Sequence, residues 1–188
     1  MNKLSYRKEN LTTLIKLSQD GEIKALEELI RRVQRNIYAF FSHLINKKED
    51  VSDLTQETLI KMAKALPKLK EPNSFKHWLN QITTNVFYDF VRKNSDKIIE
   101  YDEDKLNEIK DKIGCEPGEK CLFSEIEKLI KAALMTLPLE LRLTLILREY
   151  EGLSYDDISK ITNTTLGTVK SRISRARLKL RDELKEFI

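Results

Sequence analysis

The sequence predicts an all-α protein in which two small helical domains are joined by an acidic flexible linker. Apolar residues recur with the 3.6-residue period of a helix in both halves of the 188-residue chain. Glycine and proline, which interrupt helices, occur only five and four times. The middle segment, residues 94–121, instead carries nine acidic against five basic residues and little apolar periodicity. We therefore expect domains at 1–93 and 122–188, with the linker between them.

The overall composition excludes several classes of protein. Hydrophobic residues make up 40% of the chain, enough for packed cores, yet no apolar run is long enough to span a membrane. The amino terminus has no apolar segment like that of a signal peptide. Cys115 and Cys121 lack zinc-ligand spacing, and His43 and His77 have no partner ligands nearby in sequence. We expect a cytoplasmic protein with two free thiols (a redox switch is the alternative), no metal, no cofactor and no catalytic site.

The first domain is expected to begin with two helical stretches. Residues 11–46 form the first, with a possible break at Gly21. Residues 47–50 are charged and are expected to form a loop. Ser52 can then cap a second helix that ends near Leu66.

A loop with two prolines, PKLKEPNS at 67–74, leads into the last helix of this domain. Asn73 or Ser74 starts that helix, which continues to about Lys93. Trp78 lies among apolar residues and is expected in the core, with a wedge between DNA bases as the alternative. A short helix within the linker, near 104–112, is also expected.

The second domain shows helix-turn-helix spacing. One helix runs from Ile126 to Leu134, and Pro138 opens another that stops at Gly152. Ser154 and Asp157 then form a capping box. The short helix that follows ends near residue 161, and a turn at 162–165 precedes the most basic segment of the chain. Thr164 or Thr165 is expected to cap the helix after the turn, and Leu153 and Ile158 have the spacing of a hydrophobic staple.

That basic segment, LGTVKSRISRARLKLR at 166–181, holds six basic residues and no acid. On a helical wheel its apolar residues share one narrow face: Leu166, Val169, Ile173, Ala176 and Leu180. The small or polar residues Gly167, Ser171 and Ser174 lie opposite, with Arg175, while Lys170 and Arg177 lie on the flanks. A helix of this kind suits the major groove of DNA.

These motifs together resemble an extracytoplasmic-function (ECF) sigma factor, the two-domain class of bacterial RNA polymerase initiation subunit. The matching segments are DGEIKALEELI, DVSDLTQETLIKMAKAL and FKHWLNQITTNVFYDFVRK in the first half, and LPLELRLTLILREYEGLSYDDISKI and LGTVKSRISRARLKLRDEL in the second. GTVKSRISRAR alone could belong to other helix-turn-helix regulators, but its pairing with DLTQET and FKHWLNQI is typical of this family.

The resemblance implies a protein that binds core RNA polymerase, recognises the −35 and −10 promoter elements and helps open the DNA, with no enzymatic activity of its own. The helix that docks on the coiled-coil clamp of the polymerase β′ subunit would contribute Asp53, Leu54, Gln56, Glu57 and Ile60. Recognition and opening of the −10 element, with one base flipped into a pocket, would involve Lys68, Lys70, Asn73, Ser74, Asn85, Asp89, Arg92 and Lys93. The −35 element would contact Thr168, Lys170, Ser171, Arg172, Ser174, Arg175 and Arg177.

Some of these assignments have alternatives. Asn85 could be a buried, hydrogen-bonded amide, and Gln56 and Glu57 could be ordinary surface residues. Ser174 stands where the family often has a bulkier residue, so the −35 preference could differ. Leu178 lies on the polar side of the basic helix and could contact protein, such as the polymerase β flap.

The family also implies an anti-sigma factor or another recruiting regulator, and an acidic linker that passes through the polymerase channel. Two rival functions remain: a regulator that binds duplex DNA without polymerase, and a protein-interaction module that only occupies the polymerase clamp.

Overall fold

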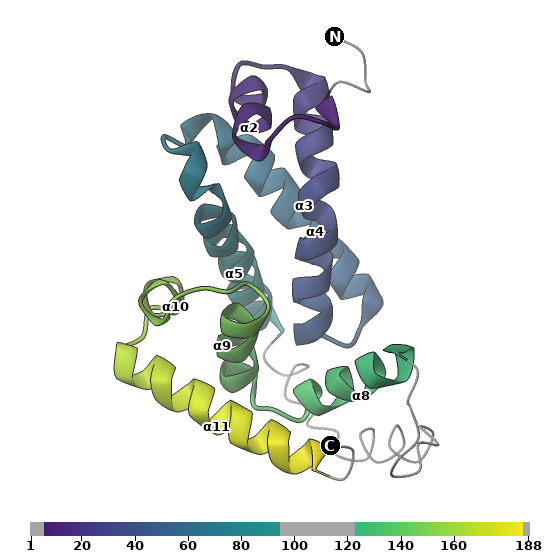
Figure 1. Ribbon diagram of the computed structural model, residues 1–188, viewed down its shortest axis with the longest axis vertical. Helices are drawn as coiled ribbons and strands as arrows, with labels where there is room; N and C mark the ends of the chain where they lie inside the picture. The colour runs from purple at the N-terminus through teal and green to yellow at the C-terminus, as the bar shows by residue number, and fades with distance from the viewer. Residues whose placement is uncertain (1–5, 95–122, 186–188) are drawn as a thin grey trace. The chain divides into compact units, whose positions relative to one another are not determined.

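The computed structural model describes residues 6–94 and 123–185, and within each of these ranges helices are joined by short connections (Figure 1). The chain divides into two compact units: Met1–Ser42 with Lys47–Lys93, and His43–Asn46 with Asn94–Ile188. Two helical domains are therefore confirmed, and no strand occurs in the part of the chain that is described. The exact domain boundaries stay a prediction. The helix expected near 104–112 and both cysteines lie outside the described residues.

Unit 1 contains α2 (Leu11–Gln19), α3 (Ile23–Leu44), α4 (Lys48–Ala65) and α5 (Phe75–Lys93). The break expected at Gly21 is present, and this residue has a φ of +89°, which favours glycine. Asn10 caps α2, because its side-chain oxygen accepts a hydrogen bond from the Thr13 amide at 2.8 Å. Phe41, Phe75 and Phe87 are among the largest side chains buried in this unit.

The start of α4 differs from the expectation. Residues 48–50 are helical rather than a loop, and Ser52 lies inside the helix instead of capping it. Lys47 precedes the helix without a side-chain capping bond, while Glu49 and Asp50 lie in its first turn, where negative charge is favourable. Burial of Val51, which is 2% exposed, gives this first turn a packing contact that a loop would lack.

The connection between α4 and α5, residues 66–74, is here called the α4–α5 loop. It contains two short 3₁₀ turns, η1 (Leu66–Lys68) and η2 (Pro72–Ser74). Each turn has a proline at its start, where the fixed φ suits the turn and the missing amide donor costs nothing. Both turns lie against α2, so this helix flanks the whole loop (Figure 1).

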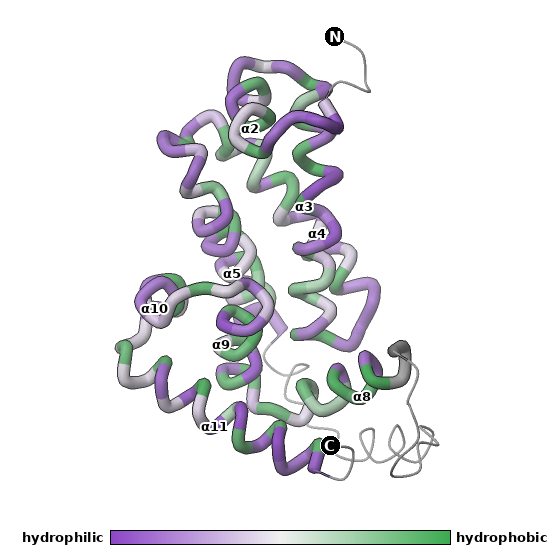
Figure 2. Tube along the Cα trace, viewed as in Figure 1, coloured by the Kyte–Doolittle hydropathy of each residue, from purple (hydrophilic) through white to green (hydrophobic). Residues whose placement is uncertain are grey.

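Unit 2 contains α8 (Phe123–Met135), α9 (Leu139–Glu149), α10 (Tyr155–Thr162) and α11 (Leu166–Leu184). The expected helix-turn-helix is confirmed, and α11 packs on α8, α9 and α10. Its Val169, Ile173 and Ala176 are at most 1% exposed, as the wheel predicts. Leu166 differs and is 37% exposed. Figure 2 shows hydrophobic and hydrophilic residues alternating along α11, as expected for a half-buried helix.

Candidate nucleic-acid interface

Hydrogen bonds fix both the start of α10 and the turn between α10 and α11. Ser154 caps α10 by accepting from the Asp157 amide at 3.1 Å, and its hydroxyl donates to the Asp157 carboxylate at 2.6 Å. Asn163 ends α10 in the left-handed conformation, with a φ of 51°. Thr165 then caps α11, accepting from the Thr168 amide at 3.2 Å. The direction in which α11 leaves the turn is therefore set locally.

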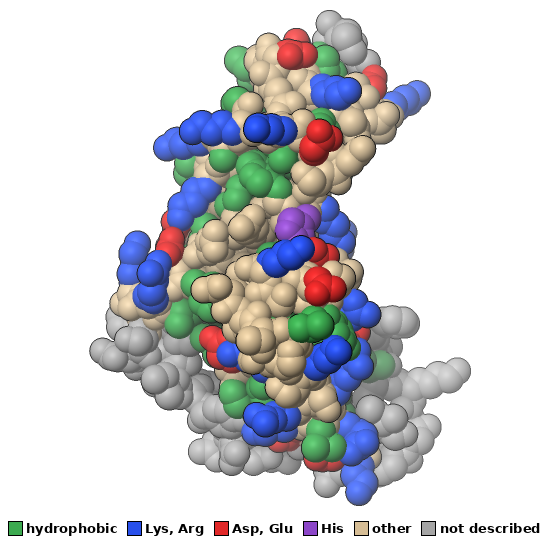
Figure 3. All heavy atoms as spheres, turned by 90° about the vertical axis from the view of Figure 1, so that its left-hand side faces the viewer, with side chains coloured by type: hydrophobic (Ala, Val, Ile, Leu, Met, Phe, Trp, Pro, Cys, Tyr) green, Lys and Arg blue, Asp and Glu red, His purple; other side chains and the backbone are tan. Residues whose placement is uncertain are grey.

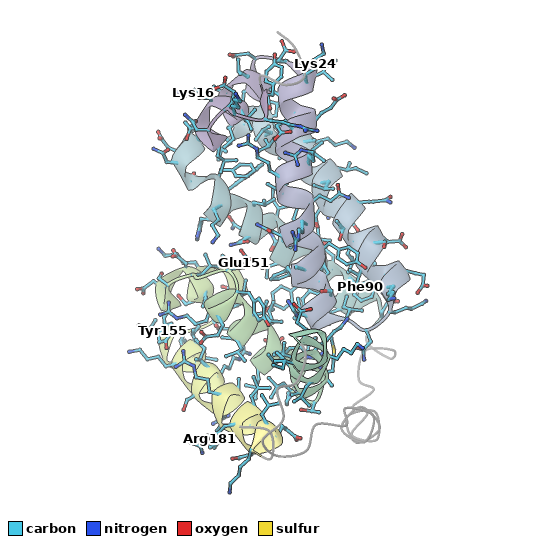
Figure 4. The ribbon with its side chains drawn as sticks, turned by 45° about the vertical axis from the view of Figure 1, so that its right-hand side comes forward. Lys16, Lys24, Phe90, Glu151, Tyr155 and Arg181 are labelled. Atoms are coloured by element: carbon cyan, nitrogen blue, oxygen red, sulfur yellow. The ribbon has the colours of Figure 1, made fainter. Side chains whose placement is uncertain are left out.

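A second set of contacts holds α10 against α9. The guanidinium of Arg148 lies 5.0 Å from the ring centre of Tyr155 and donates to the Leu153 carbonyl at 2.8 Å. Figure 4 labels Tyr155, at the start of α10. Leu153 and Ile158 are buried, which fits the expected hydrophobic staple.

The exposed side of α11 carries small and basic residues. We call Gly167, Lys170, Ser171, Ser174 and Arg175 the front face; Ser171 is half-buried and the others are exposed. Figure 3 shows Lys and Arg side chains spread over this face of the molecule, several of them in the lower part of the view. Arg181, labelled in Figure 4 near the end of this helix, has 71% of its side chain exposed. Leu178 is 50% exposed on the same helix.

Two residues that were predicted to contact the −35 element form ion pairs with α9 of the same unit. Arg172 lies 2.9 Å from a Glu140 carboxylate oxygen of α9, and only 21% of its side chain is exposed. Arg177 donates to Glu149, also of α9, from Nη2 at 2.5 Å and from Nε at 3.1 Å. The hydrogen bond from Arg177 to Glu149 raises the pKa of this arginine. Both arginines therefore hold α11 on α9, which sequence spacing alone did not indicate.

The α4–α5 loop exposes its predicted site residues. Lys68, Lys70, Asn73 and Ser74 are all exposed, whereas Leu66 and Leu69 are buried beneath them. The Ser74 hydroxyl donates to the Glu71 carbonyl at 2.7 Å, so it stabilises η2. Asn73 accepts a hydrogen bond from the Thr12 hydroxyl of α2 at 3.5 Å.

The adjoining face of α5 carries the rest of the predicted −10 residues. Asn85 is exposed, which excludes the alternative of a buried amide. Trp78, which was expected in the core, is half-buried, and its ring centre lies 5.7 Å from that of Phe75, so it lies at the edge of the core. Lys93 is exposed. A hydrogen bond from Arg92 lowers the pKa of Asp89, so this carboxylate is charged and paired at neutral pH.

One side of α4 brings together four of the five residues predicted to bind polymerase. Asp53, Gln56 and Ile60 are exposed and Glu57 is half-buried, at the three- and four-residue spacing of a single helix face. Ile60 is 54% exposed, an apolar contact open to a partner. Leu54 differs: it is 4% exposed and packs in the core. A direct polymerase contact by Leu54 would require its removal from that core.

Lys61 is a residue of this region that sequence reasoning missed. Its ammonium lies 2.8 Å from Glu57 on α4 and 3.5 Å from Asp89 on α5. The hydrogen bond with Glu57 raises the pKa of Lys61. Its position four residues after Glu57 was a sequence signal for the first pair, but the link to α5 needed the structure.

A metal centre and a membrane span are both absent from the part of the chain that the structure describes. No group of three or more His, Cys, Asp or Glu residues there could hold a metal ion. None of the described helices is both long and apolar enough to cross a membrane.

Comparison with known families identifies both units. Residues 29–97 match the model described as sigma-70 region 2, and residues 127–180 match sigma-70 region 4. The two helical units are thus those of a sigma-70-type subunit of RNA polymerase. The chain belongs to the extracytoplasmic-function (ECF) sigma factors, as the following relatives show.

The sigma-H factor of Pseudomonas aeruginosa is 31% identical over 87% of this chain and 88% of its own length. The ECF sigma-E factor of Haemophilus influenzae is 29% identical over 96% of this chain and 99% of its own length. The ECF sigma factor SigE of Mycolicibacterium smegmatis is 37% identical over 84% of this chain, but the match spans only 61% of that longer relative.

Solved structures show the same architecture. The sigma factor RpoE of Bartonella quintana, solved in complex with the anti-sigma factor NepR, superposes with a TM-score of 0.63 at 29% identity. The match covers 86% of this chain and 98% of that one. CnrH, solved with the cytosolic domain of CnrY, superposes with a TM-score of 0.62 at 22% identity. The match covers 93% of this chain and 97% of that one, and it shows a likeness of fold.

Proposed function

We propose that this sigma factor reads the −35 promoter element with the front face of α11 and opens the −10 element with the α4–α5 loop and α5. The observation that carries the proposal is the two-sided character of α11. Its Val169 and Ile173 are buried in unit 2, and its opposite side offers Lys170, Ser174 and Arg175 to solvent. Lysine and arginine can address guanine acceptors, and small residues let the helix backbone approach the groove floor.

The −10 element would be held by groups of a different kind. Asn73, Ser74 and Asn85 present amide and hydroxyl groups that can bind the edges of an unstacked base. Taking one base out of the stack costs a few kcal/mol, so contacts made only with the open strand favour melting. Lys68, Lys70 and Lys93 would add phosphate contacts, which contribute affinity without sequence preference.

Polymerase would bind the exposed face of α4. Gln56 and Ile60 are exposed side by side along this helix and would meet the β′ clamp. Leu178 would contact the β flap. RNA synthesis would belong to the polymerase in the cytoplasm, and this chain would supply recognition and strand opening. An anti-sigma factor, as in the NepR complex of the Bartonella relative, or another recruiting regulator would control access to these surfaces.

The test is transcription by core polymerase with this protein on fragmented genomic DNA, followed by sequencing of RNA 5′ ends. We expect start sites that share two upstream motifs at −35 and −10. Absence of any promoter-dependent transcript would refute the proposal.

Two rival functions give different results in parallel assays. Tight, specific duplex binding without polymerase would indicate a conventional regulator. Full activity of the double variant Lys170→Glu, Arg175→Glu would indicate a module that only occupies the clamp.

A further inference from the structure

We propose that Gln19 is a positioning residue for promoter opening: its amide group holds the α4–α5 loop in the shape that presents Lys68, Asn73 and Ser74. Gln19 itself lies on α2 and carries no predicted DNA contact. The inference rests on the proposed function of the loop and adds an element, α2, to the −10 machinery.

The contact is made by one nitrogen and two carbonyl groups. Nε2 of Gln19 donates to the Leu66 carbonyl at 2.9 Å and to the Leu69 carbonyl at 2.7 Å. A primary amide has two N–H groups, so both are used. The two carbonyls lie at either end of η1, where the Leu69 amide also donates to the Leu66 carbonyl at 3.1 Å. Gln19, which lies outside the loop, therefore bridges the two ends of η1.

The position of these carbonyls explains why the contact matters. Leu66 and Leu69 are 1% and 8% exposed, so the main chain here runs close to the core. A partly buried carbonyl without a donor costs about 1–3 kcal/mol, more than a typical hydrogen bond contributes when it forms. Without Gln19 the Leu69 carbonyl would lose its donor, whereas the Leu66 carbonyl would keep the Leu69 amide. The loop would therefore gain by rearranging to hydrate the Leu69 oxygen. Because Lys68 and Lys70 flank Leu69 in sequence, any such rearrangement would move them.

A second contact from α2 reaches the other end of the loop. The Thr12 hydroxyl donates to Oδ1 of Asn73 at 3.5 Å, a longer and weaker bond than those of Gln19. With its oxygen directed at Thr12, the Asn73 side chain keeps its two N–H donors for another acceptor. Both η1 and η2 pack on α2, so this helix supports the loop along its length. Figure 4 labels Lys16, on the exposed side of the same helix.

The chain offers a matched control on the same helix. The neighbouring Ser18 hydroxyl donates to the Leu14 carbonyl at 2.6 Å, a bond that stays within α2 and touches nothing in the loop. Ser18→Ala therefore removes a half-buried hydrogen bond from α2 without freeing a loop carbonyl. Gln19→Met keeps the length and apolar packing of the side chain and removes both donors. Gln19→Asn keeps an amide that is one methylene shorter.

The experiment compares these full-length variants as holoenzymes with core polymerase. It measures permanganate reactivity of thymines in the −10 region, base preference on promoter libraries randomised at −10 or at −35, core affinity and thermal unfolding. For Gln19→Met we expect about tenfold less opening, the scale of two lost hydrogen bonds, with a flattened −10 preference. Core affinity and the −35 preference should match wild type. Ser18→Ala should open promoters normally, and Gln19→Asn should be intermediate.

The outcomes separate this inference from the proposed function. Normal opening and an unchanged −10 preference in a folded Gln19→Met protein would overturn the positioning role. Equal losses of core binding, −35 preference and opening would also overturn it, because they would indicate a general loss of fold. If Gln19→Met does not fold, the same readings on Gln19→Asn decide. Failure of the wild-type holoenzyme to open any promoter would instead overturn the function proposed for the loop.

Discussion

In unit 1, the carboxylate of Glu28 accepts hydrogen bonds from two arginines. This carboxylate is 7% exposed and accepts from Arg31 at 2.8 and 2.7 Å and from Arg32 at 2.8 Å. Arg32 also donates to the carbonyls of Tyr6, Arg7 and Glu9, which ties the segment before α2 to α3. Hydrogen bonding to Arg31, against the opposing effect of burial, lowers the pKa of Glu28 from 4.5 to about 2.

This lowered pKa predicts how stability depends on pH. A depressed folded-state pKa stabilises the protein above the unfolded value near 4.5, and the contribution is lost as pH falls toward 2. Glu28→Gln should lower the free energy of unfolding by about 2 kcal/mol at pH 7. Between pH 4.5 and pH 3, the free energy of unfolding of this variant should fall by less than that of wild type. Urea unfolding at pH 7, 4.5 and 3 measures this, and parallel pH curves for the two proteins would contradict it.

The buried hydroxyl groups of α4 and α5 give a second prediction at the scale of single residues. Thr84 is fully buried, and its hydroxyl has no hydrogen-bond partner among the described residues. Thr84→Val should therefore raise the free energy of unfolding by about 1 kcal/mol, since it removes a desolvated polar group at constant volume. Thr55→Val is the control, because the Thr55 hydroxyl donates to the Val51 carbonyl at 2.7 Å. Equal effects of the two changes in thermal melts would refute the prediction.

At the scale of elements, the proposed function would place α9 in competition with DNA for one arginine of α11. Arg177 has 55% of its side chain exposed and is paired with Glu149, whereas Arg172 is largely covered where it meets Glu140. Exposed ion pairs contribute about 0–1 kcal/mol, so a phosphate can replace the carboxylate partner of Arg177 at little cost. The pair with Glu140 is better placed to hold the two helices together.

Glu149→Gln should therefore strengthen binding of the −35 duplex by the holoenzyme about threefold, with a steeper salt dependence, because Arg177 becomes available to a phosphate. Glu140→Gln is the matched control and should give no such gain, since Arg172 remains covered. Competition assays across a salt series measure both. A salt slope for Glu149→Gln that equals that of wild type would rule out the phosphate contact.

The exposed face of α4 gives a prediction for polymerase binding. Gln56→Ala with Ile60→Ala should weaken core affinity about tenfold or more, as expected when an exposed anchor is removed from an interface. The melting temperature should change little because both residues are exposed. Leu54→Ala should instead lower the melting temperature, because the cavity it leaves costs about 2–5 kcal/mol of stability, and it should change core affinity little. Titration of labelled core polymerase, beside thermal melts, distinguishes the two.

Across the whole molecule, features encoded by neighbouring residues were predictable and features encoded by distant ones were not. The capping box at Ser154 and the cap at Thr165 each follow from a few adjacent residues. Ser52 matched a cap by type, but charge and burial in the preceding turn moved the helix start to Lys48. The partners of Arg177 and Gln19 lie in other elements, and backbone carbonyls such as those bound by Gln19 carry no sequence signature.

The two reading surfaces proposed above, one on each unit, predict a division of labour. Lys170→Ala should relax base preference at −35 and leave the −10 profile unchanged. Asn73→Ala should do the opposite, because it removes an amide from the α4–α5 loop. Both profiles are measured on the same promoter library. A change at both elements in either variant would show that the surfaces are not independent.

The caps around Asn163 have a consequence for the thermodynamics of recognition. With Asn163 already in the left-handed conformation and Thr165 bound to the Thr168 amide, folding has removed the backbone freedom of this turn before DNA arrives. If α11 enters the groove as proposed, its association orders few further residues, and the free energy of its contacts remains available to distinguish one promoter from another.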